Sequence, residues 1–192
     1  MWNKPCMPRV PLVPHAQTRP GAVQRVDVRI ERDRDGTLAL AFGLEGRLSA
    51  LRIPAPAEPR RGHELWRHTC FEAFIARDGS TEYHELNLAP SREWAVYAFR
   101  AYRDGGPLDD ETLAPRIAVR SRANRLELDA HVALDRFSPR HRDEALRVAV
   151  SAVIEEHDGT LTYWALRHPP GTPDFHHADG FVLRLERPGV AC

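Results

Sequence analysis

Short segments rich in β-branched and apolar residues recur along the chain, and clusters of turn-forming residues separate them. Such a pattern predicts β-strands joined by turns. The pairs Asp35-Gly36, Asp78-Gly79 and Asp158-Gly159 favour tight hairpin turns. The predicted strands cover residues 23–31, 37–44, 48–53, 68–77, 83–88, 94–102, 117–120, 125–133, 146–155, 162–167 and 181–186.

Helix signals are weak by comparison. The best one covers residues 138–144, where Ser138 is suited to an N-cap and Pro139 to the first turn. Many short strands with at most one or two short helices predict an all-β fold, an antiparallel β-sandwich of jelly-roll type. Prolines punctuate residues 1–21, which we expect to form an extended arm, and residues 22–192 are expected to form one domain.

The segment 68–75 has two very different faces when its side chains alternate as in a strand. Thr69, Phe71, Ala73 and Ile75 form an ordinary core face. The opposite face carries three reactive side chains and one aromatic ring, which are His68, Cys70, Glu72 and Phe74. A solvated strand face more often carries threonine, serine or long charged side chains. The segment therefore predicts the floor of a binding groove.

The next predicted strand adds polar groups to the same side. Its leucines favour the core face, which turns Tyr83, Glu85 and Asn87 toward the groove. Aromatic walls with a few placed polar groups are typical of small-ligand sites, so Trp66, Trp94 and Trp164 are candidate stacking surfaces. The predicted ligand-binding set is Trp66, His68, Glu72, Glu85, Asn87, Trp94 and Trp164. The alternative is a solvated outer face whose polarity serves no ligand, with the tryptophans in ordinary packing.

Charge and cysteine content narrow the class of protein. Basic and acidic residues number 27 each, so the formal net charge is zero and no overall field attracts nucleic acid or an acidic membrane. Three dispersed cysteines match neither a disulfide framework nor a zinc-binding spacing, and they fit a reducing compartment. The first twenty residues lack the apolar core of a signal peptide, and we expect a cytoplasmic protein.

A histidine-rich loop follows the predicted strand 162–167. Its residues His168, Asp174, His176 and His177 carry atoms that suit zinc, although their spacing matches no established metal motif. Hydrogen bonding to the backbone is the simpler role for these histidines. For Cys70, a nucleophilic role assisted by His68 is weaker than that of a small apolar filler.

Three blocks of the chain resemble bacterial DOMON-like proteins, which are related to the family 9 carbohydrate-binding modules. They are residues 65–74 (LWRHTCFEAF), residues 83–94 (YHELNLAPSREW), and residues 163–166 (YWAL) together with 173–176 (PDFH). The resemblance spans residues 23–187 and implies a jelly-roll sandwich with a ligand groove on one sheet. It implies a sugar or haem as ligand, and it places Glu72 in the groove as the glutamate of a W-x(5)-E strand motif.

Haem-binding relatives commonly use a methionine and a histidine, but Met1 and Met7 lie outside the matched region. His68 and His168 are then the first haem candidates. No cofactor is expected, and haem and zinc are the alternatives.

The leading functional hypothesis is a non-catalytic protein that binds a carbohydrate or glycoconjugate. One alternative is a sugar hydrolase with Glu72 and Glu85 as its acid and base. Another is a haem-binding or protein-interaction module. The sequence leaves the oligomeric state open.

Overall fold

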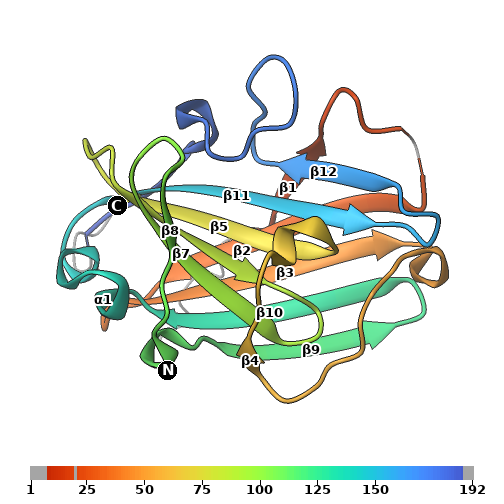
Figure 1. The fold of residues 1–192 in the computed structure, drawn as a ribbon, viewed down its shortest axis with the longest axis horizontal. Coiled ribbons are helices and arrows are strands. Elements are labelled where there is room, and N and C mark those ends of the chain that lie inside the picture. The colour runs from red at the N-terminus through yellow and green to blue at the C-terminus, as the bar shows by residue number, and fades with distance from the viewer. Residues whose placement is uncertain (1–7, 20, 188–192) are drawn as a thin grey trace.

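Thirteen strands and one short α-helix occur in the computed structural model, which describes residues 8–19 and 21–187 (Figure 1). The strands are β1 (Val10–Pro14), β2 (Val23–Arg32), β3 (Thr37–Gly46), β4 (Arg60–Arg61), β5 (Cys70–Arg77), β6 (Tyr83–Leu88), β7 (Glu93–Ala101), β8 (Asp104–Pro107), β9 (Arg116–Arg122), β10 (Arg125–Ala133), β11 (Leu146–Glu155), β12 (Leu161–Ala165) and β13 (Leu183–Leu185). The helix is α1 (Leu134–Phe137). Short 3-10 turns are η1 (Leu48–Ala50), η2 (Leu65–Arg67), η3 (Glu111–Leu113), η4 (Pro139–Arg142) and η5 (Ala178–Gly180).

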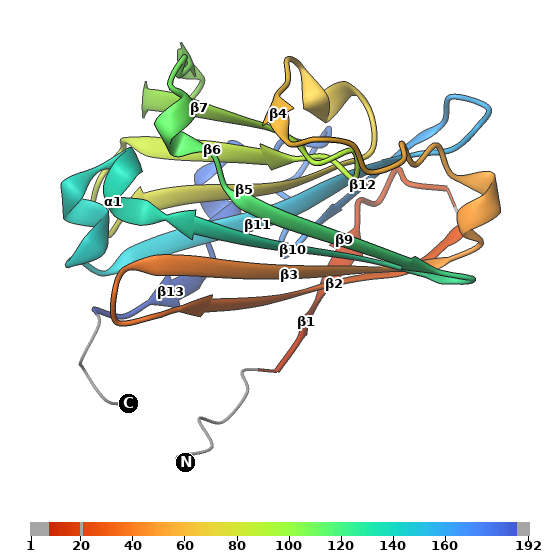
Figure 2. The ribbon, with the colours of Figure 1, turned by 90° about the horizontal axis from the view of Figure 1, so that it is seen from below.

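The strands form two layers that curl around a shared core (Figure 2). One layer has the order β4-β7-β6-β5-β11-β12, and the other has the order β1-β2-β3-β10-β9. Strand β1 joins them, because it pairs with β12 on one side and β2 on the other. Among the described strands, every pairing is antiparallel except the short contact of β4 with β7. The predicted antiparallel β-sandwich is confirmed.

The core lies between the two layers. On β5, the side chains of Phe71, Ala73 and Ile75 are buried there, as the alternation predicts. The ring of Phe71 packs on that of Phe42 from the opposite sheet, with 4.9 Å between ring centroids. Since alternate side chains of a strand point to opposite faces, this packing turns Glu72 and Phe74 to the outer face of the sheet.

Two predicted elements differ from those observed. Residues 48–53 are not a strand: they form the turn η1, and only Leu51 makes an isolated bridge, to Glu156. Of residues 138–144, four form the 3-10 turn η4, with Pro139 at its start, and the Ser138 side chain makes no capping hydrogen bond. The chain turns out of α1 directly into η4, which leaves no room for a longer helix.

The proline-rich N-terminal segment contributes a strand. In β1, Leu12 is buried against the core while its neighbours face outward. Residues 1–7, with Met1, Cys6 and Met7, lie outside the described residues, as does Cys192. Within the described ranges, no helix has the length and apolar character needed to cross a membrane.

Candidate functional site

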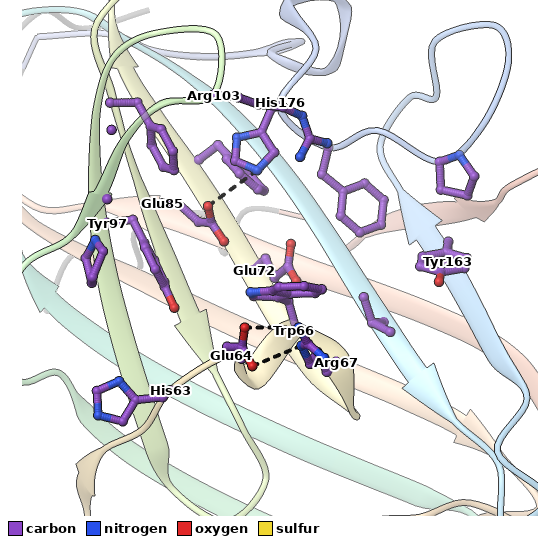
Figure 3. A pocket seen from close by; sticks show the side chains of 18 of the residues that line it. His63, Glu64, Trp66, Arg67, Glu72, Glu85, Tyr97, Arg103, Tyr163 and His176 are labelled. Carbon is purple, nitrogen blue, oxygen red and sulfur yellow. Dashed lines mark hydrogen bonds and ion pairs between the residues drawn. The ribbon is translucent and has the colours of Figure 1, made fainter.

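The outer face of the sheet β7-β6-β5-β11-β12, called the groove face below, forms the floor of a cavity of about 990 Å³ (Figure 3). Alternate residues of all five strands supply this floor. The turn η2 and the segment 63–68 border it on one side, and the loop containing Pro173, Phe175 and His176 borders it on another. The groove predicted from the alternation of residues 68–75 therefore corresponds to a cavity in the structure.

A row of polar side chains crosses the middle of the groove face. Glu72 on β5 is paired with Asn87 on β6 and with Ser151 on β11. Ser151 Oγ donates a hydrogen bond to Glu72 Oε2 at 3.2 Å. Asn87 Nδ2 donates to Glu85 Oε1 at 2.9 Å. Glu72 thus receives a neutral donor from the neighbouring strand β11, and Glu85 receives one from its own strand β6.

Both carboxyl groups are buried, and burial penalises their charged forms. It raises the pKa of Glu72 well above its usual range, and the nearby Glu85 charge raises it further. Burial likewise raises the pKa of Glu85 to about 7, against the lowering effects of the Asn87 hydrogen bond and the Arg103 charge. Burial therefore favours the protonated form of Glu72, while Glu85, with a pKa of about 7, is close to half ionised at neutral pH.

His176 lies over one end of the cavity, within 3.6 Å of Glu85 Oε2 through its Nε2 atom. Its Nδ1 shares a hydrogen bond of 2.8 Å with the Tyr83 hydroxyl. Burial and the Arg103 charge lower the pKa of His176 to about 4. The imidazole is therefore neutral at neutral pH and contributes no positive charge to the groove.

The guanidinium of Arg103 lines the cavity and forms its ion pair with Asp174, not with Glu85. It donates to Asp174 Oδ1 at 2.9 Å, and the Tyr102 hydroxyl donates to Asp174 Oδ2 at 2.7 Å. The left-handed backbone of Arg103, with φ of 55°, forms the tight turn between β7 and β8. This cluster fixes the loop that carries His176, because the His176 amide also donates to Asp174.

Aromatic rings line much of the remaining wall. Trp66, on η2, is 44% exposed and borders the cavity, and the guanidinium of Arg67 lies 5.1 Å from the centre of its ring. Phe74, Tyr97, Phe99, Tyr163 and Phe175 also line the cavity. Glu85 is paired with Tyr97 on one side and with Phe74 on the other. A carboxyl group thus lies between two aromatic residues in one cross-strand row.

Four of the seven predicted ligand-binding residues line the cavity, which are Trp66, His68, Glu72 and Glu85. His68 precedes β5 and does not belong to it, in contrast to the predicted strand 68–77, and its Nδ1 is 2.7 Å from Glu155 Oε2. Asn87 lies directly beneath the cavity as the partner of Glu85.

The other two tryptophans do not reach the groove. Trp94 is 1% exposed and packs in the core, because it is paired with Leu88 and therefore shares the core face of the sheet. Trp164 is paired with Ala152 and faces the core for the same reason, with its indole nitrogen donating to Thr162 Oγ1 at 3.0 Å. The expectation that either ring offers a stacking face to a ligand is wrong.

The candidate metal ligands do not converge. Asp174 is occupied by Arg103 and Tyr102, and His177 accepts a hydrogen bond from the Asp179 amide. His168 lies beside His15, with its Nε2 at 3.0 Å from the Val13 carbonyl oxygen. No group of three or more metal-binding side chains was found in the part of the chain that the structure describes. His68 lines the cavity and His168 does not, so the two haem candidates do not share one site.

Cys70 is a packing residue. Its thiol lies under the floor of the groove with Leu65, Ala89 and Ala95, and burial, followed by the Glu72 charge, raises its pKa. A raised pKa disfavours the thiolate that a nucleophile requires.

Several residues that line the cavity were not predicted from the sequence. Tyr97 and Phe99 alternate with Trp94 and Val96 on β7, and this alternation is a usable signal once Trp94 is assigned to the core. Arg103, Phe175 and Tyr163 reach the cavity through loop geometry and the pairing of β12 with β11, for which local sequence gives little signal.

Comparison with known proteins identifies the fold. No protein-family model and no curated protein matches the chain. A proposed carbohydrate-binding protein from Bacteroides uniformis ATCC 8492 superposes with a TM-score of 0.66 at 16% identity, over 91% of this chain and 84% of that one. A family 9 carbohydrate-binding module from Caldicellulosiruptor kristjanssonii, solved with cellotriose, superposes with a TM-score of 0.52 at 8% identity, over 84% and 74%. The chain therefore has the β-sandwich fold of the family 9 carbohydrate-binding modules.

Proposed function

We propose that this protein binds a carbohydrate in the cavity on the groove face. The observation that carries the proposal is Glu72 Oε1, a buried oxygen at the cavity that has no hydrogen-bond partner among the described residues. An unpaired buried polar atom is unfavourable, and a ligand hydroxyl would relieve this by donating to it. Sugar hydroxyls supply such donors in a dense array.

The walls suit the other half of a sugar, its apolar ring faces. Trp66 offers an exposed indole at the rim, and Tyr97, Phe99 and Tyr163 offer further aromatic surface around the carboxyl groups. Apolar walls with a few fixed polar groups are the general pattern of small-molecule sites. The volume of about 990 Å³ accommodates a mono- or disaccharide.

The structural neighbours point to the same ligand class. The module from Caldicellulosiruptor kristjanssonii was solved with cellotriose, and the Bacteroides uniformis protein is proposed to bind carbohydrate. At this level of identity the likeness concerns the fold, so the case for a sugar in this chain depends on the cavity and its side chains.

A thermal-shift screen against mono- and disaccharides tests the proposal. A ligand present at 100 times its dissociation constant stabilises the folded state by about 2.7 kcal/mol, which raises the melting temperature measurably. We expect at least one sugar to stabilise the protein and the shift to be smaller in Trp66→Ala. Val182→Ala is the matched control, because Val182 is also an exposed apolar residue but does not line the cavity. A screen with no stabilising sugar would overturn the proposal.

A second candidate function is hydrolysis of a glycosidic bond. The observation that favours it is the pair of carboxyl groups, Glu72 and Glu85, that line one cavity on neighbouring strands, with burial raising the pKa of each. Glycoside hydrolysis uses two carboxyl groups, one as acid and the other as base or nucleophile. The test is release of the chromophore from aryl glycosides, which hydrolysis predicts to vanish in both Glu72→Gln and Glu85→Gln. If the protein releases no chromophore from any aryl glycoside that it binds, hydrolysis is excluded for that glycoside and binding without catalysis remains.

A further inference from the structure

We propose that the sugar recognised in this cavity carries a positively charged amine, so that amino sugars are its preferred ligands. This inference rests on the proposed function and specifies its ligand class. It follows from the hydrogen-bonding character of the groove floor, its charge balance, and the aromatic residues that flank Glu85.

The floor of the cavity is rich in acceptors. Glu72 Oε1, at the cavity, and Asn87 Oδ1, directly beneath it, are both buried without a donor among the described residues. Glu72 Oε2 and Glu85 Oε1 each receive a donor from a neutral side chain. An ammonium group has three N–H donors and no acceptor. It matches this floor better than a hydroxyl, which has only one donor and also needs donors for its own lone pairs.

The charge that Glu72 and Glu85 carry when they ionise is poorly balanced by the described residues. Within the described residues, neither Glu72 nor Glu85 forms an ion pair with an arginine or lysine, and the one ion-pair contact of Glu85 is with His176. His176 is neutral at neutral pH, and Arg103 is hydrogen-bonded to Asp174. A buried carboxylate is normally paired with a positive charge, and here a ligand would supply it.

Other titratable groups near the pair do not supply this charge. His68 is paired with Glu155, Arg67 is paired with Glu64, and burial raises the pKa of the Tyr97 and Tyr83 hydroxyls. Cys70 beneath the floor is held as a thiol. A bound cation would therefore supply the positive charge that these protein groups do not provide to Glu72 and Glu85.

Geometry also favours a cation between the two acids. Glu72 and Glu85 are diagonal neighbours on β5 and β6, and such positions lie about 7–8 Å apart, within reach of one bridging group between the side chains. Phe74 and Tyr97 flank Glu85 on the same face. Aromatic faces attract cations, so these rings add to the carboxyl groups in stabilising an ammonium.

Isothermal titration calorimetry of the full chain at pH 6.5 tests the inference with three matched sets of sugars. Glucosamine, galactosamine and mannosamine are each compared with the parent hexose and with the N-acetyl derivative, which has the same ring but no charge. We expect at least one amino sugar to bind about tenfold or more tightly than both of its neutral counterparts. In Glu85→Gln, which removes a carboxylate at nearly constant shape, the ratio of affinities should fall toward one.

The outcomes separate the inference from the proposed function. If neutral sugars bind as tightly as the amino sugars, the amine preference is wrong and carbohydrate binding stands. If no sugar binds, both are overturned. Ethanolamine, an amine without a sugar ring, is the last arm: affinity equal to that of glucosamine would show that the ring contributes nothing and would overturn the amino-sugar assignment.

Discussion

Glu72 and Asn87 face each other across β5 and β6, and each holds a buried oxygen that receives no hydrogen bond within the described part of the chain. Glu72 is 2% exposed and Asn87 is fully buried, so bulk water does not solvate either oxygen. Two such acceptors on paired residues, one at the cavity and one directly beneath it, are unfavourable in the folded protein. Their presence is explained if the site is completed by donors from a ligand.

The rim tryptophan is expected to matter for affinity and not for stability. Trp66 is 44% exposed and lies on a 3-10 turn outside both sheets. Trp66→Ala should weaken sugar binding by about 1–3 kcal/mol, because a stacking surface is lost, and should leave the melting temperature nearly unchanged. Calorimetric titration together with a melting curve checks both halves, with Val182→Ala as control. Unchanged sugar affinity in Trp66→Ala would contradict the placement of the ligand at this rim.

The core tryptophan is expected to behave in the opposite way. Trp94 packs among the apolar side chains between the sheets, and its truncation leaves a large cavity. Trp94→Ala should lower the free energy of unfolding by about 3–5 kcal/mol. Urea denaturation monitored by circular dichroism gives this value. A loss below about 1 kcal/mol would show that the ring does not pack in the core.

Ionisation of Glu85 should destabilise the folded protein as the pH rises. Its folded pKa of about 7 lies above the unfolded value of 4.5, so the native state binds more protons between these values. The stabilising contribution of the protonated acid is present below pH 4.5 and is lost as the pH rises through 7. We expect the unfolding free energy of the wild type, relative to Glu85→Gln, to fall by about 3 kcal/mol between pH 4.5 and 8.

Urea unfolding of the two proteins across this pH range measures the difference. Because His176 is present in both, its own titration largely cancels. A difference that stays constant with pH would contradict the burial of an ionisable Glu85.

A buried histidine on the core side of the same sheet should produce the opposite dependence. Burial, with the charges of His84 and two arginines, lowers the pKa of His141 to about 3. The unfolded state therefore binds more protons than the native state below about pH 6.5, and this contribution to stability is lost as the pH falls from 6.5 toward 3.

Between pH 6.5 and 4.5, we expect the unfolding free energy of the wild type to fall by about 2–3 kcal/mol more than that of His141→Phe. The phenyl ring retains the packing against His84, whose ring centroid lies 5.0 Å from that of His141. Acid unfolding curves of the two proteins provide the measurement. Parallel curves would show that His141 is not the group that titrates.

Many of the strands, and part of the groove face, can be predicted from the local alternation of apolar and polar residues. The split of residues 68–75 into a core face and a groove face depends on strand geometry alone, and it places Glu72 and Phe74 correctly. The prediction for Trp94 was wrong because alternation within one strand does not fix which face points inward: pairing with Leu88 puts Trp94 on the core face. Residues 48–53 are apolar enough for a strand, but there the chain crosses between sheets and closes in a tight turn.

The remainder of the site depends on contacts between distant segments. His176 reaches Glu85 from a loop far along the chain, and Arg103 is held by Asp174 from the same loop. The periodicity of the sequence does not predict such contacts between distant segments, because they form only when the sheet curls and the loop packs over its face. The histidines of this loop suggested a metal site for the same reason. The sequence shows which residue types the loop contains, but it does not show where their side chains point.

Glu72 is proposed to contact the bound carbohydrate, and the dissociation constant of the best-binding sugar for the wild type and for Glu72→Leu tests this contact. Leucine has a similar size and cannot accept a hydrogen bond, so the floor keeps its shape and loses its acceptor. We predict that the dissociation constant rises at least about tenfold while the melting temperature of the free protein does not fall by more than a few degrees. An unchanged dissociation constant in a folded Glu72→Leu variant would show that Glu72 does not contact the sugar.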